Sequence, residues 1–590
     1  MIVLGINAYH GDASAVLLRN GEVVAAVEEE RFRRVKHWAG FPRDAIRVCL
    51  EMGGSTPEQV AHFAVSRDPK ANQRQKALFV LRHWPSPRLI LDRGRNRLQV
   101  QDVAGILGEE LGVRRQAITG KVNWVEHHPA HLASSFFASP FEEAAVCAID
   151  GFGDFVSTSW GIGRGKRLDV LERVYFPHSL GLIYLAVTQY LGFPKYGDEY
   201  KVMGLAPYGK PEYADALHRL IHLKPGGGFE LDFSYFRHHS DGVSMTWDDG
   251  EPTMGVVYAS KIEQLLGPAR KPEEPLTPRH EAIAASLQTV FEEAALHVLN
   301  ALYERTRLPR LCLAGGCAMN SVLNGKIRER TPFKEVYIQP AAGDNGTALG
   351  AALYVQHHVL GQPRRFVMEH GYWGPEFSDE EVSRVIEKRV VMGQLRYNLL
   401  PRVTRFTNYE LLCAWTAERI AEGKVVGWFQ GRMEWGARAL GNRSIVADPR
   451  RRDMREIINT KIKFREKFRP FAPSVLEEAL HDYFVGAVPD PFMIQVYPVR
   501  PDKRDVIPAV THVDGSGRLQ TVNRQANPRY WQLLKAFEKL TGVPVLLNTS
   551  FNENEPIVHK PEEALDCFLR TSMDVLVMGK WVVEKVRGEE

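Results

Sequence analysis

The sequence predicts an α/β protein of two domains, the first of which contains a duplicated fold. A strand–loop–strand pattern with Gly and Asp in its loop occurs twice in the first half of the chain. A polar stretch punctuated by Pro and Gly follows residue 357 and is typical of a linker. Because 590 residues exceed what one hydrophobic core usually organises, we expect two domains, at 1–362 and 363–590.

The first copy of the pattern begins at the second residue. Apolar runs at 2–7, 15–18 and 23–27 predict three strands, and Asn20-Gly21 between the last two is a strong signal for a β-hairpin. The connection between the first two strands, at 10–14, is a loop of Gly, Asp and Ser after a histidine. This opening resembles that of actin-like ATPase (ASKHA-type) domains, in which the loop faces phosphate.

The second copy spans residues 144–162. A buried-strand run at 144–149 is followed by an acidic glycine loop at 150–154 and by another strand at 156–162. Two such units fit a duplicated fold that holds a nucleotide in the cleft between its halves.

A nucleotide cradle is predicted farther along the same domain. Apolar residues at helical spacing predict a long helix over 282–305, and a strand at 311–314 leads into Gly315-Gly316. A strand, a double glycine and a helix start suit a nucleotide because helix N-termini present free N–H groups. A further strand at 336–340 enters a second glycine-rich turn at 341–350.

The second domain, which starts near Ser378, contains a strongly basic segment. Residues 432–469 hold twelve Lys and Arg against five acidic residues, an excess of seven positive charges, whereas the whole chain carries only +4. Residues 431–444 place three arginines among glycines, where guanidinium groups and backbone amides can converge on one small anion. The alternatives are a solvated face or a nucleic-acid patch. The glycine spacing, the Phe-Arg-Pro-Phe sequence at 468–471 and the small total charge favour a buried anion pocket.

The overall composition is that of an ordinary globular protein. Hydrophobic residues make up 44% and charged residues 25% of the chain, and no run of eighteen apolar residues predicts a membrane span. Residues 1–6 have the pattern of a first strand rather than of a signal peptide. The six cysteines are scattered and predict buried free thiols, so we expect a reducing, cytoplasmic location.

Two histidines near residue 130 have a spacing that is used for metal binding. His127 and His131 are four residues apart, so imidazoles on successive helical turns can reach one ion, with His127 at the helix entry because Pro129 follows closely. Asp150 and Asp344 each follow a predicted strand in a glycine-rich turn, where a carboxylate can point into a cleft. Two imidazoles and two carboxylates suit iron, manganese or zinc. The alternative is a capped or core histidine cluster.

These motifs resemble, along essentially the whole chain, those of the carbamoyltransferase family of nodulation-factor, cephamycin and aminoglycoside (tobramycin) biosynthesis. The resemblance is carried by Glu28-Glu29-Glu30-Arg31-Phe32 with Lys36-His37, by the His127–His131 cluster, and by the stretches 201–209, 343–346, 431–444 and 547–552. In that family the first domain resembles the metal-dependent ATPase-fold enzyme of threonylcarbamoyl-tRNA synthesis. The second domain resembles the carbamoyl-adenylate-forming partner of that pathway.

The resemblance implies an ATP-dependent O-carbamoyltransferase. Carbamoyl phosphate and ATP, with Mg, would form carbamoyl adenylate in the second domain, and a hydroxylated small molecule would accept the carbamoyl group in the first. A sugar or natural product, as in antibiotic biosynthesis, is the implied acceptor class. No nucleic-acid or membrane partner is expected, and the oligomeric state is left open, with a homodimer as one option.

The resemblance also implies roles for individual residues. His127, His131, Asp150 and Asp344 match the family's metal ligands, so Fe(II) or another divalent metal is the implied cofactor. The residues that match a carbamoyl phosphate pocket are Arg438, Lys463, Arg469, Arg518, Asn548 and Ser550. Arg438 and Lys463 are expected to act in catalysis together with His10, which matches a histidine beside the reacting carbamoyl group. The nucleotide is assigned to Asp12, Lys201, Gly315, Gly316, Asn320 and Asp344.

The chain departs from the family pattern in two places, and several points stay open. Ala437 stands where the family usually has proline, and residues 10–12 carry one residue more than the common His-Asp form. His10 is therefore either the base that accepts the proton of the acceptor hydroxyl or a residue that pins the first loop. Aromatic residues that either line an acceptor site or pack in the core are Tyr235, Trp247 and Tyr258.

Two other functions compete with this one. An actin-fold kinase or phosphohydrolase would transfer phosphate to its substrate and would have no use for the basic pocket. A tRNA threonylcarbamoylation-like factor would need a broad basic surface, which a net charge of +4 does not favour.

Overall fold

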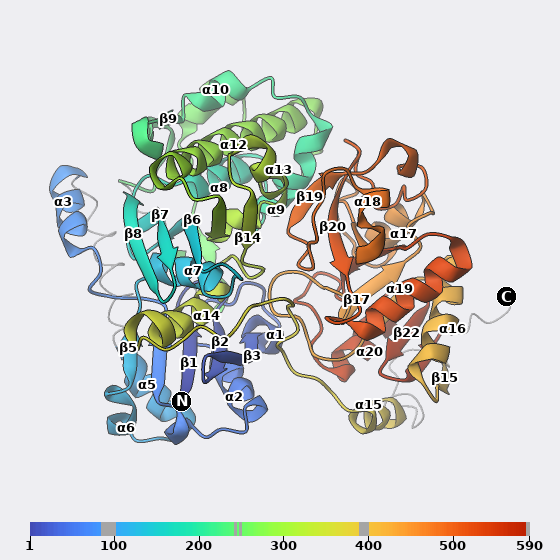
Figure 1. Cartoon of the computed structure of the whole chain (residues 1–590). Helices are drawn as coiled ribbons and strands as arrows, with labels where there is room; N and C mark the ends of the chain where they lie inside the picture. Colours follow the sequence, from blue (N-terminus) through green and yellow to red (C-terminus); the bar gives the residue numbers. More distant parts are fainter. Residues whose placement is uncertain (84–101, 241–244, 247–249, 389–400, 586–590) are drawn as a thin grey trace. The chain divides into compact units, whose positions relative to one another are not determined.

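The structure divides the chain into two units, each of the α/β class that the sequence predicts (Figure 1). It is a computed structural model that describes residues 1–83, 102–240, 245–246, 250–388 and 401–585. The first unit is Met1–Met368 and the second is Glu369–Glu590.

The first unit contains two five-stranded sheets with the same topology. In the first sheet β1 (Ile2–Asn7), β2 (Ser14–Arg19) and β3 (Glu22–Glu28) are antiparallel neighbours, and β1 is parallel to β4 (His62–Val65), which is parallel to β5 (Val122–Trp124). The second sheet repeats this pattern with β6 (Glu143–Gly153), β7 (Val156–Arg164), β8 (Arg167–Tyr175), β13 (Arg310–Ala314) and β14 (Glu335–Ile338). The predicted duplication is therefore present in the strand order of both sheets.

Two helices, one from each copy, lie between the sheets. α7 (His127–Phe136) follows β5 and packs on β6 and β13, whereas α14 (Asn345–Leu353) follows β14 and packs on β1 and β2. The two helices also pack against each other (Figure 1). A Cβ atom added at Gly350 would lie 1.7 Å from the carbonyl oxygen of Ala130, so only glycine permits this approach. The starts of equivalent helices from both copies are thereby brought together.

We expect Gly350→Ala to destabilise the first unit. The added methyl group would overlap a backbone carbonyl, and such overpacking should lower the free energy of unfolding by about 1–3 kcal/mol or more. Thermal unfolding should show a lower midpoint than for the wild type. Gly120→Ala is the matched control, because no atom lies within 4 Å of its added Cβ and its φ is −75°. Equal midpoints for the two variants would contradict the close helix packing.

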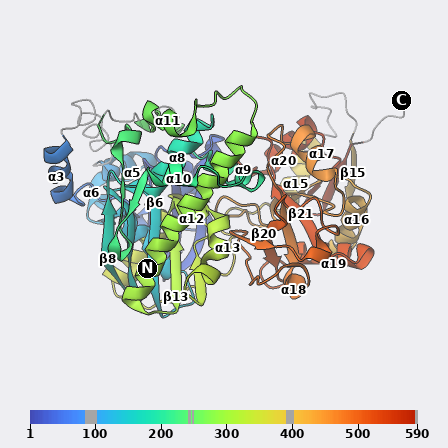
Figure 2. The ribbon, with the colours of Figure 1, turned by 90° about the horizontal axis from the view of Figure 1, so that it is seen from above.

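Further helices cover the outer faces of the two sheets. α12 (Pro278–Thr306) and α8 (Leu180–Tyr190) pack on β6, and α2 (Arg43–Met52) packs on β2 and β3. Figure 2 shows α12 lying over β6. α12 begins four residues before the predicted start because Pro278 takes the first helical position behind a Thr277 capping box. The other α-helices among the described residues of this unit are α1 (Glu30–Arg33), α3 (Gln73–His83), α5 (Val103–Leu111), α6 (Arg115–Thr119), α9 (Glu199–Leu205), α10 (Ala214–His218), α11 (Glu263–Leu266) and α13 (Ser321–Arg330).

Two turns of the first unit show how local sequence sets the strands. Asn20 and Gly21 have φ values of 53° and 89°, which is the geometry of the predicted tight hairpin. The loop predicted at 150–154 is wrong in extent, because β6 continues to Gly153 past a register shift. The turn falls instead at Asp154 and Phe155, whose φ values are 49° and 75°. Asp150 therefore lies within a strand.

The second unit is built on one nine-stranded sheet in the order β15-β23-β22-β16-β17-β21-β18-β20-β19. Its strands are β15 (Arg402–Arg405), β16 (Val426–Phe429), β17 (Arg443–Ala447), β18 (Ala472–Leu476), β19 (Gln495–Pro498), β20 (Ser516–Val522), β21 (Val545–Ser550), β22 (Val575–Met578) and β23 (Trp581–Glu584). Its α-helices, within the part that the structure describes, are α15 (Asp379–Ile386), α16 (Tyr409–Ala421), α17 (Met454–Lys461), α18 (Leu480–Tyr483), α19 (Pro528–Thr541) and α20 (Pro561–Arg570). Residues 430–442, most of the arginine-rich loop, connect the antiparallel strands β16 and β17.

All six cysteines are free thiols, of which five are buried and Cys317 is half-buried. Within the described ranges, none of the helices combines the length and the hydropathy that crossing a bilayer requires.

Candidate functional site

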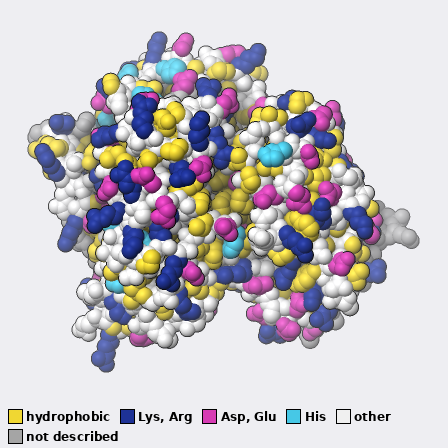
Figure 3. Space-filling model, in the orientation of Figure 1, with side chains coloured by type: hydrophobic (Ala, Val, Ile, Leu, Met, Phe, Trp, Pro, Cys, Tyr) yellow, Lys and Arg dark blue, Asp and Glu magenta, His cyan; other side chains and the backbone are white. Residues whose placement is uncertain are grey.

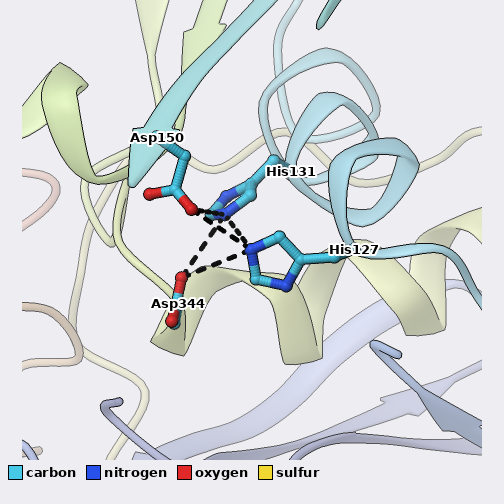
Figure 4. Close-up of side chains that lie close together, drawn as sticks. All are labelled: His127, His131, Asp150 and Asp344. Atoms are coloured by element: carbon cyan, nitrogen blue, oxygen red, sulfur yellow. Dashed lines mark hydrogen bonds and ion pairs between the residues drawn. The ribbon is translucent and has the colours of Figure 1, made fainter. Parts of the chain in front are cut away.

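Four side chains of the first unit converge on one point (Figure 4). His127 and His131 come from the first turns of α7, Asp150 from β6, and Asp344 from the residue that caps α14. The two Nε2 atoms are 3.1 Å apart. The Nε2 atom of His127 lies 3.4 Å from Asp150 Oδ2 and 3.5 Å from Asp344 Oδ1, and that of His131 lies 3.9 and 3.5 Å from the same oxygens. The predicted quartet is thus one cluster.

The chemistry of this donor set fits a divalent cation. Two carboxylates and two imidazoles each offer a ligand atom, and these atoms all lie within 4.8 Å of one another. Both imidazoles are fully buried. His128 differs, because its ring nitrogens contact Ser159 Oγ at 3.1 Å and the carbonyl oxygen of Val156 at 2.9 Å, so it is a core residue.

The electrostatics of the quartet favour a positive charge at its centre. Burial lowers the pKa of His127, but hydrogen bonds to Asp150 and Asp344 outweigh it and raise the pKa to about 10. Burial and the charge of Asp344 raise the pKa of Asp150, yet the two histidines lower it to about 2. Burial likewise opposes ionisation of Asp344, and its histidine neighbours hold the pKa well below the usual range. Both carboxylates are therefore ionised and require a proton or a cation between them.

Neighbouring backbone groups hold the quartet in place. The N–H of Gly316 donates to Asp150 Oδ1 at 2.8 Å, so the predicted glycine cradle contacts a ligand of the cluster. Asp154 Oδ2 accepts from the N–H of His127 at 3.0 Å, at the start of α7. A Cβ atom at Gly153 would lie 2.2 Å from the His127 ring, so glycine is required there.

His10 lies beside the quartet. Its Nδ1 atom is 3.6 Å from Asp344 Oδ2, and its ring stacks on that of His127 with the centroids 4.7 Å apart and the planes 20° from parallel. Burial lowers the pKa of His10, although the hydrogen bond to Asp344 opposes this. A largely neutral imidazole in this place suits a proton acceptor, but the same contacts also suit a residue that pins the loop.

The residues predicted to bind the nucleotide each contact a different neighbour, and their assignment to a nucleotide stays a prediction. Asp12 Oδ1 contacts His37 Nδ1 at 2.8 Å, and Lys201 Nζ lies 2.9 Å from Asp198 Oδ1. Gly315 has a φ of 91°, and a Cβ atom there would lie 2.2 Å from a backbone oxygen of the neighbouring strand β6. Asn320 Oδ1 accepts from the N–H of Leu323 at 3.0 Å, so this side chain caps α13.

Two of the three aromatic residues considered for an acceptor site are described by the structure, and both pack against other side chains. Tyr235 is buried, with the ammonium of Lys261 4.6 Å from its ring centroid. Tyr258 packs edge-on against Tyr190 at 5.8 Å. Trp247 lies outside the described residues. The acceptor contacts thus remain unassigned.

Four arginines of the second unit form a second constellation. Burial lowers the pKa of Arg518 well below its usual value, and the positive charges of Arg438, Arg465 and Arg469 lower it further. The Arg518 Nε atom is buried, and no hydrogen-bond partner for it occurs in the part of the chain that the structure describes. Positive charges close enough to act on one another in this way suit an anion with several oxygens.

A buried lysine adjoins a loop of the same unit. Lys463 is 1% exposed, and its ammonium donates to the carbonyl oxygens of Ser550 at 2.5 Å and Asn552 at 2.8 Å. It also donates to Asn552 Oδ1 at 2.6 Å, which accepts from Ser550 Oγ at 2.8 Å. The sequence prediction missed Asn552 and Arg465. Each lies two residues after a predicted site residue, and this spacing is the signal that was available.

The arginine-rich loop differs from the prediction that its three arginines converge on one anion. Arg432 donates to the carbonyl oxygens of Trp373 at 2.7 Å and Gly374 at 3.1 Å. Arg443 is fully buried, donates to the carbonyl oxygen of Gln430 at 2.6 Å and stacks 3.7 Å from the Phe429 ring centroid. Arg443 thus donates to a carbonyl of the loop and Arg432 to carbonyls of a neighbouring segment, since carbonyls away from water need donors. Arg438 alone joins the arginine cluster.

Basic and acidic side chains are mixed on one face of the molecule (Figure 3). On the face shown in Figure 3, side chains of Lys and Arg are interspersed with those of Asp and Glu. The described residues of that face form no continuous basic stripe of the kind that nucleic acid requires.

Comparisons with known proteins identify the family of the chain. Residues 2–353 match the family model described as Carbamoyltransferase N-terminus, and residues 417–585 match the one described as Carbamoyltransferase C-terminus. The chain is 42% identical to an uncharacterized protein of Synechocystis sp., over 99% of this chain and 96% of that protein. It is 39% identical to nodulation protein NolNO of Sinorhizobium fredii, over 98% of this chain and 80% of that protein.

A solved structure with some likeness is the ROK hexokinase from Thermus thermophilus, at 14% identity and a TM-score of 0.29, over 60% of this chain and 98% of that one. This likeness is too distant to support a conclusion, so the fold assignment rests on the strand order. The family models cover most of both units, and the relatives extend along nearly the whole chain. This protein is therefore an enzyme of the carbamoyltransferase family.

Proposed function

We propose that this carbamoyltransferase is an ATP-dependent O-carbamoyltransferase that acts through carbamoyl adenylate. It would take the carbamoyl group from carbamoyl phosphate and pass it to a hydroxyl of a sugar or natural product. The observation that carries this proposal is the presence of an arginine cluster and a buried lysine in one unit and of a His/Asp quartet in the other. The first suits an anionic substrate, and the second suits a divalent metal.

In the second unit the pocket residues would bind carbamoyl phosphate as a dianion. Arg438, Arg469 and Arg518 would neutralise its phosphate, and each charge-assisted hydrogen bond should contribute about 1.5–3 kcal/mol. Lys463 and Ser550 would lie at the same site, joined by their own hydrogen bond. The atoms balance when one water molecule enters: carbamoyl phosphate, ATP and water give carbamoyl adenylate, pyrophosphate and phosphate. Mg²⁺ would accompany the ATP.

In the first unit the quartet would hold Fe(II) or another divalent metal, which when bound supplies a Lewis acid for a carbamoyl or phosphate oxygen. His10 would accept the proton of the acceptor hydroxyl as its oxygen bonds to the carbamoyl carbon and AMP leaves. The low pKa of this buried imidazole keeps it available as a base near neutral pH. The nucleotide would be placed by Asp12, Lys201, Gly315, Gly316, Asn320 and Asp344.

Carbamoyl transfer can be tested with a panel of acceptors. The protein, ATP, Mg²⁺ and ¹³C-labelled carbamoyl phosphate are incubated with sugars, glycosides and polyketide alcohols, and the products are analysed by mass spectrometry. We expect one acceptor class to gain a labelled carbamoyl group, with AMP and pyrophosphate formed in equal amounts. A phosphorylated acceptor together with ADP would instead support the actin-fold kinase.

A further inference from the structure

Three polar side chains form a buried hydrogen-bond relay across the sheet of the second unit. Ser474 lies on β18, Gln520 on β20 and Asn548 on β21, which are adjacent strands. All three side chains are at most 1% exposed. Ser474 Oγ donates to Gln520 Oε1 at 2.7 Å, and Asn548 Nδ2 donates to Gln520 Oε1 at 3.0 Å. We refer to these three residues as the amide relay.

A backbone carbonyl fixes the direction of every hydrogen bond in the amide relay. The carbonyl oxygen of Leu440 can only accept, so the Gln520 side chain must turn its Nε2 atom toward it, at 2.8 Å. The Oε1 atom of Gln520 then faces the other two members and can only accept from them. Asn548 must therefore turn its Nδ2 atom toward Gln520.

A second carbonyl fixes the orientation of Asn548 independently. Its Nδ2 atom also lies 3.2 Å from the carbonyl oxygen of Ala439, which again can only accept. The Oδ1 atom consequently points away from both partners. It is a buried acceptor, and within the described ranges it has no hydrogen-bond partner. An unpaired buried acceptor is costly, so a ligand that offers an N–H group here would gain a favourable hydrogen bond.

The amide relay adjoins the residues proposed to bind carbamoyl phosphate. Ala439 and Leu440, which it holds, directly follow Arg438 in the loop. Arg518 precedes Gln520 by two residues on β20, and Ser550 follows Asn548 by two residues on β21. Residues two apart on a strand face the same side, so the open acceptor lies on the sheet face that carries these groups.

We propose that Gln520 and Ser474 are positioning residues that hold Asn548 with its Oδ1 atom toward the ligand. The Oδ1 atom then accepts from an N–H group of the ligand and so selects an acyl phosphate that carries one. This inference rests on the proposed function. The amino group of carbamoyl phosphate would donate to Asn548 Oδ1. Acetyl phosphate has nearly the same shape but carries a methyl group there, and would leave the acceptor unpaired. A site built around a hydrogen bond discriminates strongly against such analogues, so the preference should be at least about tenfold.

Competition between the two acyl phosphates measures this preference. Pyrophosphate release from ATP is followed with carbamoyl phosphate as substrate and acetyl phosphate as competitor. The measured quantity is the inhibition constant of acetyl phosphate divided by the KM of carbamoyl phosphate. Asn548→Leu removes the acceptor, and Gln520→Glu replaces the donor that faces Leu440 with an oxygen. Gln495→Glu is the matched control, because Gln495 lies on β19, outside the amide relay, and its side-chain oxygen accepts from Tyr497 at 2.9 Å.

We expect the ratio to fall about tenfold or more in Asn548→Leu and Gln520→Glu and to stay at the wild-type value in Gln495→Glu. Partial unfolding lowers both affinities together and leaves the ratio unchanged. Where a variant releases no pyrophosphate, calorimetric titration of both compounds without ATP gives the same ratio. Unchanged ratios in both relay variants would overturn the inference while leaving the proposed function intact. No pyrophosphate release by the wild type would overturn the proposed function, and the inference with it.

Discussion

Arg438→Ala is expected to lower pyrophosphate release in the presence of carbamoyl phosphate by at least about a hundredfold. Two charge-assisted hydrogen bonds of about 1.5–3 kcal/mol each would be lost from the substrate phosphate. The other arginines of the loop cannot replace Arg438, because Arg432 and Arg443 bind backbone carbonyls. Enzymatic detection of pyrophosphate with saturating ATP measures the loss.

Arg452→Ala is the control for this substitution. It removes the same charge from the same basic segment, but Arg452 is 74% exposed and pairs with Asp505 at the surface. Surface ion pairs contribute little, so the control should release pyrophosphate at nearly the wild-type rate. Near-normal release by Arg438→Ala would remove this arginine from the anion pocket.

His131→Ala is expected to strip the metal from the first unit and to stop carbamoyl transfer. Its Nε2 atom is one of four converging ligand atoms, and a site of three ligands with an unfilled position should bind a divalent ion far more weakly. Pyrophosphate release should continue, because Arg438, Lys463 and the other pocket residues belong to the second unit. Metal analysis by plasma mass spectrometry and the two half-reactions are measured on the same preparation.

His128→Asn is the matched control for the metal site. His128 is equally buried in the same helix, but its ring nitrogens hydrogen-bond Ser159 and Val156 rather than a member of the quartet. This variant should keep one metal per chain. A stoichiometric metal in His131→Ala would show that the ligand set is wrong, and simultaneous loss of both half-reactions would contradict their division between the units.

Much of the first unit follows from local sequence rules. The apolar runs, the Asn20-Gly21 turn and the helix over 282–305 are set by neighbours in sequence, and the structure contains each of them. The His/Asp quartet was also predictable in outline, because the spacing of His127 and His131 places both on one helix face. What joins them to Asp150 and Asp344 is the duplicated topology, in which the starts of α7 and α14 meet.

The second unit contains features that local sequence rules do not predict. All three arginines of the loop have the same local chemistry, yet Arg432 and Arg443 donate to carbonyls of the loop and of nearby segments, and only Arg438 joins the cluster. The choice depends on which buried carbonyls need donors, and this is fixed by tertiary contacts. The amide relay was unpredictable for the same reason. Its members lie on three strands far apart in sequence, and its direction is set by one backbone oxygen of Leu440.

The most direct test is ³¹P and ¹³C NMR of the wild-type protein with ATP, Mg²⁺ and ¹³C-labelled carbamoyl phosphate, without any acceptor. We predict that pyrophosphate and phosphate accumulate only when both substrates are present, and that the labelled carbon becomes attached to AMP. Pyrophosphate release that does not depend on carbamoyl phosphate, or conversion of ATP to ADP alone, would contradict activation of the carbamoyl group by the second unit.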